Sequence, residues 1–182
     1  MLPAALRPDR LTTRWRRVVE LITGLLIATH ALLGAVFLGG LIGRWIVLGM
    51  AERADTLVRM QTLTRAAQPF ERIVIIGSQV VVVLGILAAI AQGRPFLGPI
   101  QGAPVDWLFV SVVLVFTVPV IVPLVFLPRG RVFDAALANA TAQDQITPEL
   151  VAAWRDPVVR AAHVYELVIV TVVFLLMVTK PF

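Results

Sequence analysis

Four long apolar segments, separated by charged ones, set the pattern of this chain. Residues 21–43, 73–93 and 107–128 contain no Asp, Glu, Lys or Arg, and residues 161–179 carry only Glu166. A helix rises about 1.5 Å per residue, so segments of this length cross the roughly 30 Å hydrocarbon core of a bilayer. The segments are continuously apolar rather than alternating, which argues against membrane-spanning strands. The pattern predicts an all-α bundle of four transmembrane helices.

The predicted helices form one integral membrane domain over residues 1–182. The connection between the first and second helices, residues 44–68, mixes apolar positions with charges and predicts an interfacial helix that ends at Pro69. The polar connection between the third and fourth helices, residues 129–160, also predicts helical turns. We expect the spanning helices to cover about 18–44, 70–93, 106–128 and 157–180.

Two helix starts and one kink follow from local signals. Thr147-Pro148-Glu149 combines an N-cap residue with proline at the first helical position, which predicts a short helix. Asp156-Pro157 repeats this signal at the start of the fourth spanning helix. Pro119 and Pro123 lie inside the third apolar segment, so we expect that helix to be kinked.

The composition agrees with a membrane protein. Hydrophobic residues make up 59% of the chain and charged residues 15%, with a mean hydropathy of +0.90, whereas about a quarter of a soluble domain is charged. The net charge of +5 comes from arginines in tails and connections, which favours the lipid bilayer over nucleic acid as the partner. The sequence holds no cysteine, which excludes disulfides and thiolate metal sites.

The distribution of positive charge leaves the orientation open. With the N-terminus in the cytoplasm, seven Lys and Arg residues lie inside and nine outside. The total therefore slightly favours the opposite orientation, whereas the five arginines of the N-terminal tail favour this one.

Small residues predict close packing of the first two helices. Ala31, Ala35, Gly39 and Gly43 recur at every fourth position, and the second apolar segment has a similar series. Small side chains let membrane helices approach closely. We expect this row to pack the first helix against the second; the alternative is an interface with a second copy or another membrane subunit.

His30 lies near the middle of the first apolar segment. Ionisable residues at this depth usually face the interior of a bundle. As a cofactor-binding residue His30 could ligate haem b or a metal, or take part in a proton relay. The alternative is a neutral histidine that forms a hydrogen bond to a neighbouring helix.

His163 and Glu166 share one face of the fourth helix at i, i+3 spacing. A di-metal site needs several carboxylates from facing helices, and the other apolar segments have none. His163 is a candidate second haem ligand, but His30 and His163 fall on opposite sides of the midplane, about 13 Å apart in height. The estimated heights therefore disfavour a two-histidine haem.

Glu166 lies closer to the midplane, about 6 Å away, and Gln79 in the second apolar segment has the same estimated depth on the same side. Buried polar groups in a bilayer need partners. We therefore predict a buried polar cluster of Gln79 and Glu166, with His163 one turn nearer the membrane surface.

The chain resembles a family of bacterial four-helix integral membrane proteins whose domain has no assigned function. The likeness covers the chain at the level of topology and depends on short motifs. They are the segment from His30 to Gly40 (HALLGAVFLGG), Asp-Trp-Leu-Phe at the start of the third helix, Leu-Pro-Arg-x-Arg at its end, and Met-Val-x-Lys-Pro near the C-terminus. The arginine-rich tail and His163 depart from that pattern. A looser similarity, based on His30, links the chain to HemJ-type haem proteins and CopD-type copper proteins.

The sequence lacks a catalytic triad pattern, a phosphate-binding glycine loop and a nucleotide fingerprint. We therefore expect a non-enzymatic accessory or small-ligand-binding protein of the bacterial cytoplasmic membrane. The alternative is a haem-b or metal-binding membrane protein of redox or porphyrin metabolism that uses His30.

Overall fold

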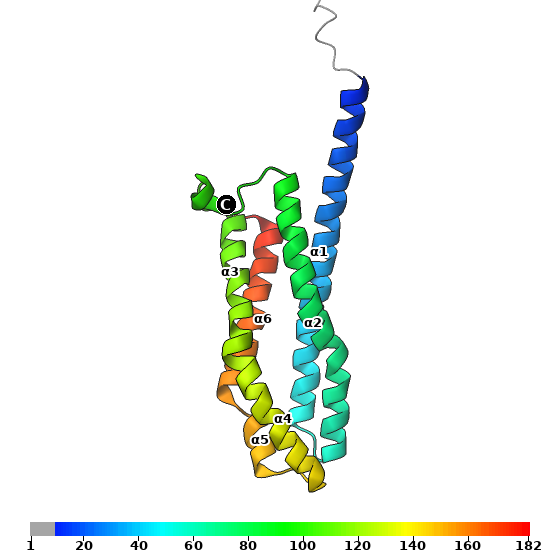
Figure 1. Cartoon of the computed structure of the whole chain (residues 1–182), viewed down its shortest axis with the longest axis vertical. Coiled ribbons are helices and arrows are strands. Elements are labelled where there is room, and N and C mark those ends of the chain that lie inside the picture. Colours follow the sequence, from blue (N-terminus) through cyan, green and yellow to red (C-terminus); the bar gives the residue numbers. More distant parts are fainter. Residues whose placement is uncertain (1–9) are drawn as a thin grey trace, which may run out of the picture.

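The computed structural model describes residues 10–182, which are helical apart from short connections (Figure 1). Four stretches of helix are long and apolar enough to cross a membrane, as the sequence predicts. The elements, in chain order, are α1 (Arg10–Glu52), α2 (Leu57–Ala91), the 3-10 turn η2 (Gly98–Gln101), α3 (Trp107–Ile121), the π-helical segment η3 (Val122–Phe126), α4 (Leu127–Ala142), α5 (Pro148–Trp154) and α6 (Pro157–Thr179).

The long helices form two pairs. α1 packs against α2 along much of its length, α3 packs against α6, and a smaller contact between α1 and α6 joins the pairs. α1 extends beyond the other helices at its N-terminal end, and the short helix α5 lies at the opposite end of the bundle (Figure 1). The contact between α1 and α6 is therefore the main link between the two pairs within the apolar segments.

Glycines set the close approach of α1 and α2, but only part of the predicted row takes part. A Cβ atom added to Gly43 would lie 2.6 Å from the Phe70 ring, and one added to Gly40 would lie 2.7 Å from Ile73. Gly39 has nothing within 4 Å of such an atom, and Ala31 and Ala35 are exposed.

The prediction for Gly39 is therefore wrong, and helix geometry gives the reason. Each step of four residues turns about 40° around the axis, because successive residues are about 100° apart. Three such steps carry the row from the exposed side of α1 at Ala31 to the α2 side at Gly43. Only the last member of the row therefore packs against α2.

The connection between α1 and α2 is a tight hairpin rather than a separate interfacial helix over 44–68. α1 continues to Glu52, and α2 begins at Leu57 after the N-cap Thr56, whose hydroxyl accepts a hydrogen bond from the Arg59 amide. Pro69 lies inside α2 and does not end it. Prolines are tolerated inside helices where tertiary contacts compensate for the lost hydrogen bond, and the neighbouring Phe70 packs on Gly43.

The predicted kink in the third spanning helix takes the form of a π-helical turn. α3 ends at Ile121, and the amide of Leu127 donates to the Val122 carbonyl, five residues back. Pro123 lacks an amide hydrogen and its ring clashes with a regular α-helical carbonyl four residues earlier. The wider turn accommodates that proline and lets the helix continue as α4.

Both predicted helix starts are confirmed. Thr147 caps α5, with its hydroxyl accepting from the Leu150 amide at 3.3 Å. Asp156 caps α6, with one carboxylate oxygen accepting from the amides of Val158 and Val159 at 2.8 and 3.3 Å. These caps satisfy helix amides that have no partner inside the helix.

Two separate clusters of buried side chains hold the bundle together. The membrane core joins α1, α2 and α6 through Phe37, Leu41, Val74 and Val170. The end core, beyond the charge-free segments, joins α2, α4 and α5 through Leu57, Met60, Ala140 and Leu150.

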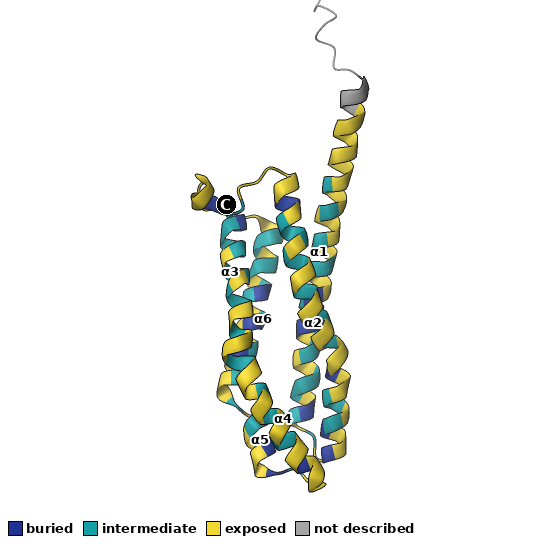
Figure 2. Cartoon of the chain, viewed as in Figure 1, coloured by how far each residue is buried: buried dark blue, intermediate teal, exposed yellow. Residues whose placement is uncertain are grey.

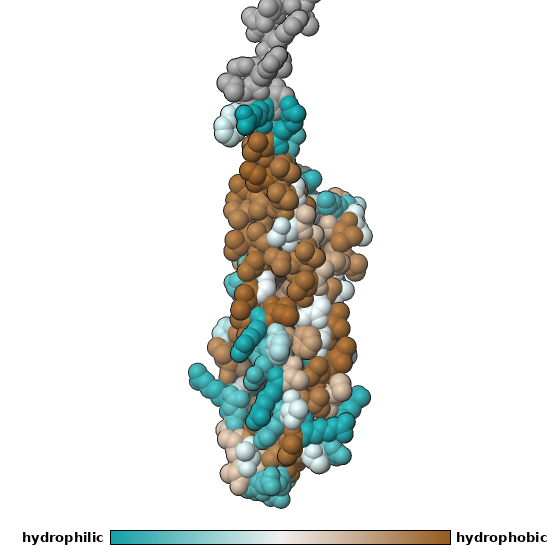
Figure 3. Space-filling view, turned by 90° about the vertical axis from the view of Figure 1, so that its right-hand side faces the viewer, coloured by the Kyte–Doolittle hydropathy of each residue, from teal (hydrophilic) through white to brown (hydrophobic). Residues whose placement is uncertain are grey.

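Most of the remaining helix surface is exposed (Figure 2). On the face shown in Figure 3, apolar side chains cover the upper half of the bundle, while hydrophilic ones gather over its lower end. An apolar surface of this kind is expected where membrane-spanning helices face lipid.

Candidate functional site

A buried charge cluster connects α1 and α6. The Arg44 guanidinium forms an ion pair with the Glu166 carboxylate, and these side chains are only 12% and 7% exposed. The same Arg44 nitrogen lies 3.3 Å from Nδ1 of His163, which is itself 3.8 Å from Glu166. We refer to Arg44, His163 and Glu166 as the buried charge cluster.

The helices place these three side chains for simple geometric reasons. His163 and Glu166 lie three residues apart and so share one face of α6. Arg44 is the first charged residue after the apolar segment of α1 and follows Gly43, which packs against the Phe70 ring of α2. α1 and α6 run in opposite directions (Figure 1). The face of α6 that carries His163 and Glu166 therefore lies beside Arg44.

His163 also contacts the π-helical segment. Its ring lies 4.7 Å from the Phe126 ring, centroid to centroid, at an interplanar angle of 31°. Phe126 is the last residue of η3. Short π-helical turns recur at functional sites, and this one positions an aromatic ring against the imidazole of the cluster.

Charged residues continue from the cluster towards the end of the bundle. Glu52, two turns after Arg44 on α1, accepts a 2.8 Å hydrogen bond from Arg160 and lies 3.7 Å from Arg155. A helix rises about 12 Å between Arg44 and Glu52. Charged side chains therefore meet between α1 and α6 at two levels, with Glu52 and Arg160 nearer the end of the bundle and Arg44 and Glu166 deeper.

Gln79 does not belong to this cluster. It lies on an exposed part of α2, whereas Glu166 is buried with Arg44 as its partner. The predicted pairing of Glu166 with Gln79 is therefore replaced by a pairing with Arg44. The physical reason is that a guanidinium neutralises a buried carboxylate, which an amide cannot do.

His30 forms a helix-packing contact with α2. Its Nδ1 lies 2.9 Å from the Val81 carbonyl oxygen, to which it can donate, and a Cβ added to Gly85 would lie 2.8 Å from the imidazole. The absence of a side chain at Gly85 therefore makes room for the ring. This geometry matches the interhelical hydrogen bond that the sequence left as an alternative to cofactor binding.

The two histidines do not face a common site. His30 contacts Val81 and Gly85 of α2, whereas His163 contacts Arg44 and Phe126. Along α1, His30 and Arg44 are separated by about 21 Å of helix rise. Two axial ligands of one haem must lie on opposite sides of a single ring. These residues therefore do not fit a two-histidine haem, and no group of three or more His, Asp or Glu side chains suited to a metal occurs in residues 10–182.

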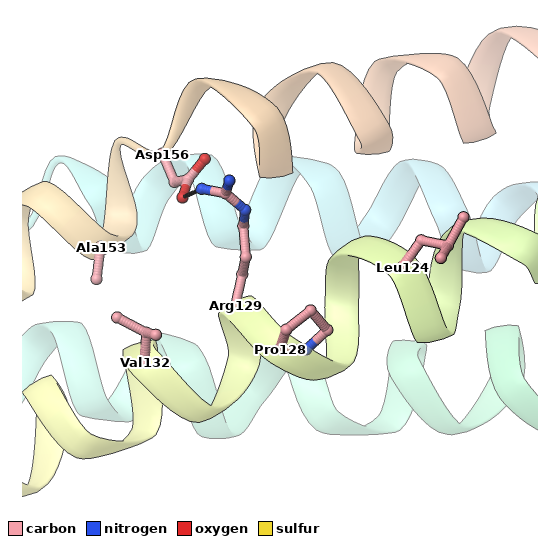
Figure 4. A pocket seen from close by; sticks show the side chains of 6 residues that line it. All are labelled: Leu124, Pro128, Arg129, Val132, Ala153 and Asp156. Carbon is pink, nitrogen blue, oxygen red and sulfur yellow. Dashed lines mark hydrogen bonds and ion pairs between the residues drawn. The ribbon is translucent and has the colours of Figure 1, made fainter.

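A surface cavity of about 360 Å³ lies between α4 and the segment that joins α5 to α6 (Figure 4). Its polar groups are Arg129 and Asp156, which form an ion pair with each other. Asp156 also caps α6. Both polar groups thus already have partners within the protein, and we assign no ligand to this cavity.

Sequence reasoning missed Arg44 as a site residue. Arg44 follows the charge-free segment of α1, so the sequence pattern assigns it to an interfacial connection. One signal in the sequence is the helical pattern that continues past residue 43, because a helix that continues past the membrane segment keeps its faces in register with its buried part. Only the packing of α6 shows that Arg44 turns inward.

Comparison with known proteins gives a family and no closer relative. No curated protein and no solved structure matches the chain. The likeness to HemJ- and CopD-type proteins consequently remains a prediction based on His30. The family described as "Predicted integral membrane protein (DUF2269)" matches residues 12–181, nearly the whole chain. On this match, the multi-pass bundle described above belongs to that family of predicted integral membrane proteins, whose function is unknown.

Proposed function

We propose that the protein is a non-enzymatic accessory protein of the bacterial cytoplasmic membrane whose small ligand is the proton. The proton is bound and released at the buried charge cluster, and its binding controls how firmly the α1/α2 pair is held to the α3/α6 pair. The observation that carries this proposal is the Arg44–Glu166 ion pair. It joins the two helix pairs, its side chains are largely buried, and His163 lies beside it.

The chemistry of the cluster supports a proton as the ligand. Arg44 stays charged, because a guanidinium is not deprotonated in proteins. Glu166 and His163 can each take up a proton, and acid–base groups within membrane bundles recur in proton relays. The other side chain described against the imidazole is the uncharged Phe126, and the next charged groups towards the surface are Arg160 and Glu52.

Protonation has a structural consequence in this position. When Glu166 becomes neutral, Arg44 loses its counter-charge while its side chain remains only 12% exposed. An unpaired buried charge is unstable by several kcal/mol. Arg44 then turns towards water and headgroups at the end of the apolar segment, and the contact between α1 and α6 loosens.

The absence of cysteine makes this motion measurable with spin labels at introduced cysteines. Ile46 on α1 and Val164 on α6 are both exposed, at 52% and 45%, and flank the ion pair. In lipid nanodiscs we expect the distance between labels at these positions to lengthen or broaden reversibly on acidification. The double variant Glu166→Gln/His163→Gln should remove the pH dependence, since neither amide can be protonated in this range.

A matched label pair controls for general effects of pH. Val113 on α3 and Val168 on α6 are exposed positions within one helix pair, so their distance should stay constant. A 46–164 distance that is the same at every pH contradicts the proposal. So does a pH response that survives in Glu166→Gln/His163→Gln.

A further inference from the structure

Two cations meet at one tryptophan at the end of the bundle opposite α5. The Arg94 guanidinium carbon lies 5.5 Å from the centroid of the Trp107 ring, and the Lys180 nitrogen lies 5.6 Å from it. Arg94 comes from the α2–α3 connection, Trp107 opens α3, and Lys180 caps α6. We refer to Arg94, Trp107 and Lys180 as the tryptophan–cation cluster.

The depth of this cluster is set by the apolar segments. Arg94 directly follows the charge-free segment 73–93, Trp107 begins the segment 107–128, and Lys180 directly follows the segment 161–179. All three residues therefore lie where helices leave the hydrocarbon. This is the level of the lipid headgroups, where tryptophan is enriched and where Lys and Arg meet phosphate.

Within residues 10–182, neither cation forms an ion pair with a carboxylate of the protein. The neighbouring Asp106 uses its carboxylate to accept a 2.9 Å hydrogen bond from the Phe109 amide and so caps α3. At the opposite end of the bundle, by contrast, Glu52, Asp55 and Asp156 pair with arginines.

Local contacts fix the backbone that carries the two cations. Lys180 adopts a left-handed conformation with φ 45°, and its amide donates to the Leu176 carbonyl at 2.9 Å. Gly98, with φ 50°, lies so close to Phe109 that an added Cβ would come within 2.8 Å of that ring. The connection that carries Arg94 is therefore packed onto the first turn of α3.

We propose that the tryptophan–cation cluster binds the phosphate of an anionic phospholipid. Two cations that share one indole and have no carboxylate partner among the described residues attract a phosphodiester, which offers them charge-assisted hydrogen bonds. The indole supplies the apolar wall for the lipid's glycerol and upper chain. This site is independent of the buried charge cluster, because it shares no residue with it and lies at the other end of α6.

Lipid retention by the purified full-length chain tests the site. Protein in nanodiscs of mixed phosphatidylglycerol and phosphatidylcholine is extracted, and the lipids that stay bound are counted by native mass spectrometry. We expect the wild type to retain phosphatidylglycerol selectively. Each cation near an anionic surface contributes about fivefold, so the double variant Arg94→Gln/Lys180→Gln should lose about 25-fold in selective retention.

The control removes two other exposed cations. Arg53 and Arg131 are exposed at the opposite end, outside any described ion pair, so Arg53→Gln/Arg131→Gln changes the net charge equally and should retain the lipid. The conservative variant Arg94→Lys/Lys180→Arg should also retain it. An equal loss in the control variant would mean that general surface charge binds the lipid, and this overturns the proposal.

Inorganic phosphate distinguishes a lipid from a free anion. Excess phosphate should leave bound phosphatidylglycerol in place, because the free ion lacks the contact with Trp107. Trp107→Leu should weaken retention while the conservative Trp107→Phe preserves part of it. Displacement by phosphate at concentrations similar to those of the lipid, or full retention in Trp107→Leu, would contradict a phospholipid site.

Discussion

Arg44 on α1 and Glu166 on α6 form an ion pair 122 positions apart in the sequence, at a place where the flanking surface is apolar. Each charge makes the other tolerable in a buried position, where a charge left without its partner costs several kcal/mol. Their pairing joins the two helix pairs at a point where few other contacts do so. The stability and the arrangement of the bundle should therefore both depend on this pair.

Removing one member of the pair should destabilise the protein by about 3–5 kcal/mol, because the other charge remains buried without a partner. We expect Glu166→Leu to show the full effect and Glu166→Gln a smaller one, since the amide oxygen still accepts a hydrogen bond from Arg44. The double variant Arg44→Leu/Glu166→Leu should recover most of the loss. Reversible unfolding in mixed micelles measures all three.

The exposed pair of Asp55 and Arg59 is the control, with side chains 75% and 62% exposed. Its removal should cost no more than about 0.5 kcal/mol, as is usual for i, i+4 pairs on a surface. If Arg44→Leu/Glu166→Leu is as unstable as the sum of its single variants, the two residues are not coupled and the ion pair does not hold the helices together.

Substitutions at neighbouring glycines of α1 should differ sharply in their effects. Gly43→Leu places a side chain against the Phe70 ring, and Gly40→Leu places one against Ile73. We expect a loss of about 1–3 kcal/mol at each, as is typical of overpacking. Gly39→Leu should be tolerated, because nothing lies within 4 Å of the added Cβ. Thermal midpoints in detergent compare the three, and an equal loss at Gly39 would contradict the described packing of α1.

His30 and Gly85 should show size compensation. Gly85→Ala pushes a methyl group to 2.8 Å from the imidazole and should destabilise the wild type. His30→Ala alone should cost about 0.6–1.7 kcal/mol through the lost hydrogen bond to Val81. In the His30→Ala background the alanine at position 85 gains space, so its additional cost should fall close to zero. If Gly85→Ala destabilises the protein equally in both backgrounds, the imidazole does not occupy the space beside Gly85.

The number and type of helices could be predicted because a bilayer imposes a strict rule on sequence. Charges are excluded over a full membrane thickness, so each spanning helix is visible as a charge-free segment. The helix starts at Thr147 and Asp156 could also be predicted, because a capping residue and the amides it binds lie within three residues of each other. These features need no knowledge of neighbouring helices.

The composition of the buried charge cluster could not be predicted, because it depends on how separate helices rotate and slide against each other. Depth alone placed Gln79 level with Glu166, yet depth does not say which way a residue faces around the axis. Gln79 turns outward and Arg44 inward. The same limit explains Gly39, since a row of small residues curves around the helix and only one part of it meets α2.

The end core should unfold independently of the membrane core. Leu150 is fully buried between α2, α4 and α5, and Thr147 caps α5 at 3% exposure. Leu150→Ala should cost about 2–5 kcal/mol, as is typical of large cavities, and Thr147→Ala about 1 kcal/mol through the lost cap. Because α5 has only seven residues and depends on these contacts, we expect the loss to appear as local opening.

Hydrogen exchange read by mass spectrometry can locate that opening. In Leu150→Ala, peptides from α4 and α5 should exchange faster, while those around Phe37 and Val170 in the membrane core remain protected. Val132→Ala is the control, because that side chain is 62% exposed and its truncation leaves no cavity. Uniformly faster exchange throughout α1, α2 and α6 would instead mean that the two cores form one cooperative unit.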